Sequence, residues 1–462
     1  MPSLPPLLAT TETLVVGGGI SGLYAALLLA RRGKRARVIE RSARLGGLSG
    51  AEEFRGIARD LGSQRLHPAA LAQPLLREIH AQSPFRERPR RDVLLLGDRR
   101  VPCPPTASAI ASALGLRASV AAASGFLARA TRRRAFASQG RDQGDQESDV
   151  GFESFVRERV GERAYQALYS PYAEKIWGLD PSELSQTIAR KRLGAERPWS
   201  LVAGVAGRAA RWIAADPRRD DEPSHAFVAP AGGASSIVAW LEAELVRAGV
   251  PIEPNRAFRP EDRARGPVLF AGDLRDLAPT SLEHRGLYLV YLALPSARAG
   301  AGAEETFTSP DSRHWFARVT ELERDAQESA EERILCVEIP EGAWGRGVEF
   351  SRGELFDALL AQLVWTGILP PGVRPLASHQ RFLPSVYPLY RRGWLTEWRA
   401  TMRRVATLGN VVPIGQQGLF LHGSLDQRAA VAEAAVDHLE AGGSVAAWIE
   451  KAEALLELRV QS

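Results

Sequence analysis

Residues 14–24 read LVVGGGISGLY, and this stretch limits the possible folds of the chain more than any other. An apolar run stops at closely spaced glycines and resumes at once as LYAALLLARRG, with apolar residues at helical spacing. Gly17, Gly19 and Gly22 fit G-x-G-x-x-G, the pattern of a strand that turns directly into a helix. The glycines alone are a weak signal, because such turns also occur for packing reasons.

A second strand and an acidic residue strengthen this interpretation. RARVIE follows the helix and reads as a short strand that ends in Glu40. Glu40 lies near the offset of about 20 residues at which an acid meets a ribose 2′-hydroxyl, and its charge would repel the 2′-phosphate of NADP. The unit predicts a dinucleotide-binding α/β domain, with the amides of Gly17, Gly19 and Ile20 on the pyrophosphate.

Composition narrows the class of protein further. The 462 residues include 45% hydrophobic and 24% charged residues, which is typical of a globular protein. The net charge is +5, but 54 acidic residues are interspersed with the basic ones, so we predict no nucleic-acid partner. Cys103 and Cys336 are the only cysteines, and the eight histidines have no metal-ligand spacing. We therefore predict neither a disulfide framework nor a metal site.

The sequence favours a cytoplasmic protein. No apolar stretch approaches the roughly 20 residues that span a bilayer, and the N-terminus MPSLPPLLATTE does not resemble a signal peptide. Residues 106–138 combine apolar residues at helical spacing with ATRRRAF. They predict a surface helix pair; the alternative is a basic amphipathic patch that contacts a membrane peripherally. With the polar run after it, 106–148 reads as a helical and flexible insertion.

The residues after Glu40 carry a resemblance to a known family. RSARLGGLSG (41–50) resembles the E-x-x-x-R-x-G-G continuation of the FAD-binding amine oxidase and protoporphyrinogen oxidase superfamily. DLGSQRLHP (60–68) and PYAEKIWGLDPSEL (171–184) are similar to blocks of bacterial protoporphyrinogen-oxidase-like and UDP-galactopyranose-mutase-like flavoproteins. HWFARVTELE, SVYPLY and GNVVPIGQQGLFLHGSLDQ fit the same group in the same order. The resemblance covers nearly the whole chain.

The resemblance implies an α/β fold with two interleaved domains. An FAD-binding Rossmann-like domain of the glutathione-reductase type would comprise 11–75, 226–280 and 405–447, with PVLFAG and NVVPIG as strands of its sheet. An α+β substrate or cap domain would comprise 76–225 and 281–404, with GLYLVYLAL and RILCVEIP as strands. The implied cofactor is FAD.

The predicted cofactor-binding residues come from the glycine turn, the segment after Glu40, the 60–68 segment and the C-terminal block. In that block Ser424 would cap a helix that starts near Leu425 and aim its free amides at the flavin; the alternative is an ordinary cap with no ligand. The full set is Gly17, Gly19, Ile20, Ser21, Gly22, Glu40, Arg41, Arg44, Gly46, Gly47, Leu48, Gly62, Ser63, Gln64, Arg65, Gly415, Gln416, Ser424, Leu425 and Asp426.

His67, Arg318 and Tyr387 are the candidate catalytic residues. His67 lies on the segment that runs beside the flavin in relatives, although a lone histidine is usually structural. Arg318 lies in FARVTE, similar to the strand that reaches a substrate phosphate in the mutases. An ion pair with Glu321 or Glu323 is the alternative for Arg318, and simple packing is the alternative for Tyr387.

Departures from the family pattern bear on mechanism. Gln64 stands where many relatives have histidine, Gln416 replaces the arginine of G-R-x-G, and His422 replaces a tyrosine. An amide at 64 cannot titrate, and the amide at 416 removes a cation near the flavin or diphosphate. The change at 422 counts against a mutase.

These residues leave several functions open. The first hypothesis is an FAD-dependent oxidoreductase that oxidises a C–C or C–N bond of a small-molecule substrate through the flavin. The second is a non-redox nucleotide-sugar mutase that needs reduced flavin and a diphosphate clamp. The third is a catalytically degenerate FAD-binding scaffold. The electron acceptor and the oligomeric state stay open.

Overall fold

The computed structural model describes residues 12–62, 64–89, 91–97, 99–103, 150–162, 165–193, 226–296, 306–322, 332–344 and 354–456. The predicted insertion at 106–148, its proposed membrane contact and Ser63 lie outside the described residues.

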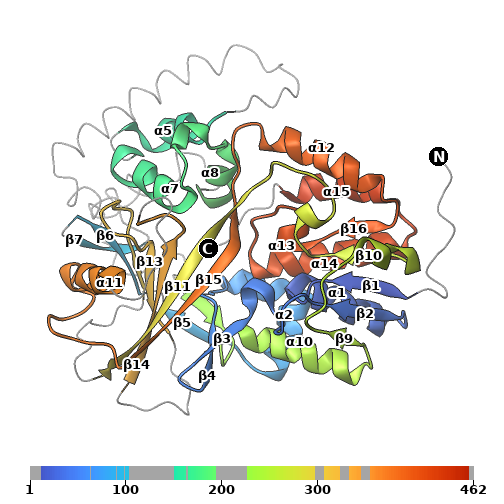
Figure 1. The fold of residues 1–462 in the computed structure, drawn as a ribbon, viewed down its shortest axis with the longest axis horizontal. Helices are drawn as coiled ribbons and strands as arrows, with labels where there is room; N and C mark the ends of the chain where they lie inside the picture. Colours follow the sequence, from blue (N-terminus) through green and yellow to red (C-terminus); the bar gives the residue numbers. More distant parts are fainter. Residues whose placement is uncertain are drawn as a thin grey trace, which may run out of the picture.

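A parallel sheet forms one half of the molecule (Figure 1). Its strands follow the order β16-β10-β1-β2-β9, and they span Val411–Pro413, Val268–Phe270, Thr13–Val16, Ala36–Ile39 and Ile252–Glu253. These strands lie within the three ranges predicted for the cofactor domain. The domain boundaries themselves stay predictions.

Both faces of the parallel sheet are covered, as parallel sheets require. Val15 and Val38 face the main core beneath the helices, while Leu14 and Val16 pack with Ile39 on the other face. Helix α1 packs against α14 and α10, and Trp448 of α15 donates from its indole nitrogen to the Pro413 carbonyl at 2.8 Å. The helices of this half are α1 (Ile20–Arg31), α10 (Ser235–Arg247), α12 (Trp394–Ala406), α13 (Gly415–Gly418), α14 (Leu425–Glu440) and α15 (Val445–Leu456).

A mixed sheet forms the other half (Figure 1). Alternate residues of its long strand β11 face opposite ways: Val290 and Leu292 pack towards α11 (Glu354–Trp365), whereas Leu289 and Tyr291 pack towards the cofactor half. The strand order is β15-β11-β14-β13-β12-β6-β7, with bounds Ala377–Pro388, His284–Pro295, Glu332–Pro340, Arg318–Glu321, Thr306–Thr308, Asp92–Leu96 and Arg99–Cys103.

Smaller elements connect the two halves. They are the hairpin β3 (Ala51–Phe54) and β4 (Ile57–Asp60), the pair β5 (Arg86–Pro89) and β8 (Ala226–Ala229), and helices α2 (Pro74–Gln82), α5 (Phe152–Val160), α7 (Ser170–Trp177) and α8 (Gln186–Leu193). In Figure 1, α5, α7 and α8 lie together above the mixed sheet.

The predicted α/β fold class is confirmed by the parallel sheet and its covering helices. PVLFAG and NVVPIG form β10 and β16, which pair in parallel through Val268 and Val411. No helix in the described ranges is long and apolar enough to cross a membrane. The cytoplasmic location stays a prediction.

Candidate dinucleotide-binding site

A cavity of about 810 Å³ opens at the carboxyl ends of β1, β2, β10 and β16. Ligands of open α/β sheets bind at this end of the strands, because the strand-to-helix turns gather there. Most of the lining comes from the glycine turn, residues 39–52, residues 256–258, residues 271–276, β15, α13 and Arg428. The cavity thus draws on segments from most of the chain.

The first glycine turn leaves no room for side chains where the chain doubles back. A Cβ at Gly22 would lie 1.9 Å from the Gly17 carbonyl oxygen, so only glycine fits this crossing of turn and helix. A Cβ at Gly19 would meet nothing closer than the Gly46 oxygen at 3.9 Å, so Gly19 leaves open space at the start of α1. The first amides of α1 have no acceptor within the helix and can serve an anion.

The prediction for the Gly17 amide is wrong. This amide donates to the Ile39 carbonyl at 2.8 Å and extends the pairing of β1 with β2. The Gly17 residue still lines the cavity, with φ of +98°. Strand pairing requires this donor, so the anion site is left to the amides that begin α1.

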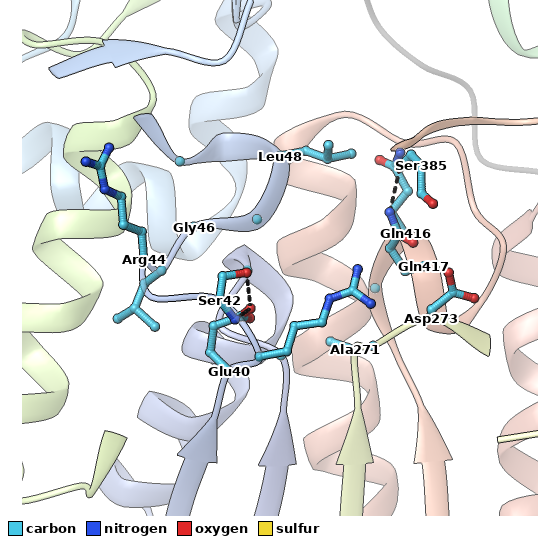
Figure 2. A pocket seen from close by; sticks show the side chains of 18 of the residues that line it. Glu40, Ser42, Arg44, Gly46, Leu48, Ala271, Asp273, Ser385, Gln416 and Gln417 are labelled. Atoms are coloured by element: carbon cyan, nitrogen blue, oxygen red, sulfur yellow. Dashed lines mark hydrogen bonds between the residues drawn. The ribbon is translucent and has the colours of Figure 1, made fainter. Parts of the chain in front are cut away.

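Glu40 lies immediately after β2 and joins two turns (Figure 2). One carboxylate oxygen accepts from the Gly18 amide at 2.7 Å, and the other accepts from the Ser42 amide and hydroxyl at 2.8 and 2.7 Å. The residue is 8% exposed and lines the cavity. Because Ser42 donates twice to one carboxylate oxygen and Gly18 donates once to the other, the second oxygen can accept one more hydrogen bond, and a ribose hydroxyl suits this position.

The second glycine loop forms the wall beside Glu40. The Gly46 amide donates to the Gly18 carbonyl at 2.7 Å, which ties the two glycine turns together. A Cβ at Gly46 would lie 2.5 Å from the Gly50 Cα, so the loop closes only with glycine there. Gln64 does not line the cavity; its side-chain amide donates to the Leu48 carbonyl. Gln64 therefore positions the loop that forms the wall.

The opposite wall contains neutral amides (Figure 2). The side chains of Gln416 and Gln417 in α13 donate to the Val386 and Ser385 carbonyls of β15 at 2.8 and 2.6 Å. The Gln417 Oε1 is buried and has no hydrogen-bond partner among the described residues. A buried acceptor without a hydrogen-bond partner costs free energy. A hydrogen-bond donor on a ligand would supply the missing partner.

Several lining residues were not predicted from the sequence. Asp273 lies just after β10. The predicted strand PVLFAG could have indicated this residue, because ligand-binding residues follow the carboxyl ends of parallel strands. Its carboxylate binds the Arg275 guanidinium; burial opposes ionisation, but these hydrogen bonds leave the pKa of Asp273 below its usual value. Arg381 and Ser385 come from β15, and Arg428 comes from α14. No sequence pattern connected these positions to the glycine turn.

Some predicted cofactor residues do not line the cavity. Arg65 forms an ion pair with Asp92 and donates to the Thr306 hydroxyl, at the junction with the mixed sheet. Residues 22, 62 and 424–426 are also absent from the lining, although Ser424 is the N-cap of α14, as predicted. The lining does include Gly17, Gly19, Ile20, Ser21, Glu40, Arg41, Arg44, Gly46, Gly47, Leu48, Gly415 and Gln416 from the predicted set.

The three candidate catalytic residues lie in different surroundings. His67 is exposed, and its Nδ1 accepts from the Ala69 amide at 3.2 Å, which corresponds to the structural interpretation. Tyr387 packs edge-on against Trp177, with ring centroids 5.6 Å apart. The structure places Tyr387 close enough to Arg318 for the two to interact electrostatically, whereas the hydrogen bond described for His67 is with its neighbour Ala69.

Arg318 forms a bidentate ion pair with Glu338 and not with Glu321, one of the two alternative partners, whereas Glu323 lies outside the described residues. Its Nε and Nη2 donate to the two carboxylate oxygens at 2.8 Å each across the β13–β14 pair. Burial opposes the charge of Arg318, but the Glu338 carboxylate outweighs this effect and raises the arginine pKa. Glu321 instead pairs with Arg333 at 2.7 Å. The Arg318 charge is therefore largely neutralised.

These features define a domain with a Rossmann-type fold and its glycine turn. A sequence model of the NAD(P)-binding Rossmann-like domain matches residues 15–81, which include the glycine turn, Glu40 and the second glycine loop. Among the described residues, no group of three His, Cys, Asp or Glu side chains is placed to hold a metal ion.

Solved structures with this fold match nearly the entire chain. Reduced UDP-galactopyranose mutase has a TM-score of 0.75 at 15% identity, covering 98% of this chain and 99% of that one. A protoporphyrinogen-oxidase-like protein from Exiguobacterium sp. 255-15 has a TM-score of 0.65 at 16% identity, covering 94% and 99%. Cyclohexylamine oxidase from Brevibacterium oxydans IH-35A has 0.61 at 16%, covering 93% and 99%. The chain has the fold of the amine oxidase and protoporphyrinogen-oxidase-like superfamily, as the sequence resemblance implies.

Proposed function

We propose that this chain binds FAD and oxidises a C–C or C–N bond of a small molecule. The Glu40 carboxylate carries the cofactor proposal, since it closes the glycine turn through Gly18 and lines the same cavity. The open space at Gly19, the unpaired Gln417 Oε1 and a cavity of about 810 Å³ suit an extended dinucleotide. In this cavity Glu40 would bind the ribose, and the start of α1 would bind the diphosphate.

Bound FAD would supply the hydride- or electron-accepting group that amino-acid side chains lack. The chain's own residues would hold the cofactor and orient the substrate. Gln416 and Gln417 bond the β15 carbonyls on one side, and Gln64 holds the Leu48 carbonyl on the other. These amides fix the two walls of the cavity without a titratable group. We therefore infer that these three amides position the walls and take no part in proton transfer.

The pairing of Arg318 favours oxidation over sugar-nucleotide chemistry. A diphosphate clamp needs an uncompensated cation, but Glu338 is 2% exposed and occupies both donors on one side of the guanidinium. Trp177, Tyr387 and His422 form an aromatic cluster with ring centroids 5.6–6.2 Å apart. Such a surface suits an uncharged or cationic substrate better than a diphosphate.

Spectroscopy of the purified protein tests this proposal. We expect a yellow protein that releases FAD on denaturation and whose flavin absorbance bleaches when amines or other oxidisable small molecules are added without oxygen. Oxygen or another acceptor should restore the colour. A protein that binds no flavin after incubation with FAD would overturn the cofactor proposal. A flavoprotein that no such compound reduces, but that dithionite reduces, would count against the oxidase.

A mutase is the second candidate, because the match to UDP-galactopyranose mutase has a TM-score of 0.75, against 0.65 and 0.61 for the two oxidase-like structures. A mutase would isomerise a UDP-sugar only after its flavin has been reduced, and the reaction would consume no electrons. Arg318→Ala and Glu338→Gln separate the candidates. A clamp at Arg318 predicts weaker UDP binding in Arg318→Ala and tighter binding in Glu338→Gln, where the arginine charge is released. We expect the affinity for UDP to be the same in both variants as in wild type.

A further inference from the structure

Arg428 differs in its surroundings from the other arginines that line the cavity. Arg256 pairs with Glu253 and Asp262 at 2.9 Å, and Arg381 lies 3.7 Å from Glu52. Arg44 lies 3.9 Å from Glu52, and Arg41 is exposed with Asp276 nearby. Each of these charges is balanced or solvated.

The Arg428 guanidinium has no carboxylate within ion-pair distance among the residues that the structure describes. Its one side-chain hydrogen bond there runs from Nε to the Ser424 carbonyl and is long, at 3.4 Å. The side chain is partly buried, and burial lowers the pKa of Arg428 to about 10, because the nearby Asp426 offsets the desolvation only in part. A partly buried cation without a partner is costly unless an anion binds it.

The backbone around Arg428 places it beside the start of α1. The Ser21 hydroxyl, in the first turn of α1, donates to the Arg428 carbonyl at 3.0 Å. A Cβ at Gly415 would lie 3.1 Å from the Ser21 Oγ, so the start of α13 also approaches closely. Ser21, Gly415 and Arg428 all line the cavity. The first turns of α1 and α14 therefore meet at the end where an anion is expected.

We propose that Arg428 binds the diphosphate of the dinucleotide and replaces the cation that Gln416 does not provide. Gln416 is a neutral amide bonded to the Val386 carbonyl, so it brings no charge to this wall. The guanidinium of Arg428 presents planar paired donors, which match phosphate oxygens. This inference rests on the proposed function, because it takes FAD as the ligand.

The test compares Arg428→Met with wild type in three measurements. These are the affinity for FAD by fluorescence quenching, the affinity for ADP by calorimetry, and the melting temperature of the apoprotein. We expect both affinities to fall about 10- to 100-fold, since each good hydrogen bond to a charged group contributes at about this level. The apoprotein should melt at the same temperature or about 2–4 °C higher, because an unpaired buried charge is removed.

Two further variants separate binding from folding. Arg428→Lys keeps the charge but loses the paired donors, so its affinities should fall between those of wild type and Arg428→Met. Arg399→Met removes an arginine that pairs with Glu453 at 3.0 Å outside the cavity, and its affinities should match wild type. A lower melting temperature in Arg428→Met with unchanged affinity for ADP would mean a purely structural role and overturn the proposal.

The outcomes also distinguish this inference from the proposed function. Wild-type protein that binds ADP but not FAD, with ADP binding weakened in Arg428→Met, would support the role of Arg428 and overturn the FAD proposal. If wild-type protein binds FAD and the FAD and ADP affinities of Arg428→Met are within about twofold of the wild-type values, only the role of Arg428 would be overturned. Wild-type protein that binds neither ligand would overturn both.

Discussion

Glu40 illustrates how one side chain can both build a site and serve it. Its two oxygens accept from Gly18 on one side and from Ser42 on the other, so the first glycine turn and the loop after β2 share one carboxylate. The residue type and its spacing from the glycines were readable in the sequence. The Ser42 contact was not, because it depends on how the loop folds back.

Glu40→Gln should weaken FAD binding. The amide nitrogen would face the donor of either Gly18 or Ser42, which leaves a buried amide unpaired and costs about 1–3 kcal/mol. We expect a loss of affinity of about 10- to 100-fold, measured by fluorescence titration. Glu53→Gln is the control, since Glu53 has a side chain 68% exposed and does not line the cavity. Equal affinities in both variants would exclude a role for Glu40.

His284 makes stability depend on pH. Burial lowers its pKa from the ordinary 6.5 to about 4, with Asp273 opposing and Arg275 adding to the shift, and neither ring nitrogen has a hydrogen bond within the described residues. The unfolded chain therefore takes up the proton first as the pH falls. The contribution of neutral His284 to the free energy of unfolding is fully present above pH 6.5 and is lost as the pH falls to about 4. At about 1.4 kcal/mol per pKa unit, this loss is roughly 3 kcal/mol.

Urea unfolding across this pH range checks the effect of His284. His284→Asn should show a shallower loss of stability between pH 6.5 and about 4 than wild type. Identical slopes in wild type and His284→Asn would show that another group is responsible.

At the scale of elements, the short helix α13 depends on its contacts with β15. Two side-chain amides, from Gln416 and Gln417, bond successive carbonyls of the strand. In the sequence, Gln416 is a departure from a family pattern that has arginine at this position, whereas Gln417 is at a position that the pattern leaves open. The structure shows that they fasten the C-terminal block to a strand of the mixed sheet, a contact between residues far apart in sequence.

Replacing both glutamines by alanine should loosen this wall. Each side-chain hydrogen bond contributes about 1 kcal/mol, so Gln416→Ala/Gln417→Ala should lower the melting temperature by about 2–8 °C. FAD affinity should also fall, because β15 and α13 both line the cavity. Differential scanning calorimetry and a fluorescence titration measure the two effects. Gln166→Ala, at an exposed helix contact with Glu162, should change neither quantity.

At the scale of the molecule, the cavity joins segments from both ends of the chain. FAD should therefore stabilise the fold as a whole: at a concentration of about 100 times Kd the gain is about 2.7 kcal/mol. The melting temperature should rise with FAD concentration. NADP should give no such rise, because the Glu40 carboxylate repels a 2′-phosphate. Equal shifts with NADP and FAD would contradict the role given to Glu40.

Local sequence patterns predict the parallel half of the fold and the first part of the site. The glycine turn, the helix after it, the strand before Glu40, β10, β16 and α14 are all local patterns, because periodicity and glycine spacing act over a few residues. These local patterns assign Gly19 and Glu40 to one site, the family resemblance adds Gly46, and all three line the cavity.

The side chains from distant parts of the chain that complete the cavity could be identified only in the folded structure. Arg381 and Ser385 of β15 and Arg428 of α14 reach it because two sheets and two helices pack across long separations in the chain. The partner of Arg318 was decided in the same way, since strand register sets it opposite Glu338. Local pattern carries no information about register or packing, so these contacts follow only from the assembled core.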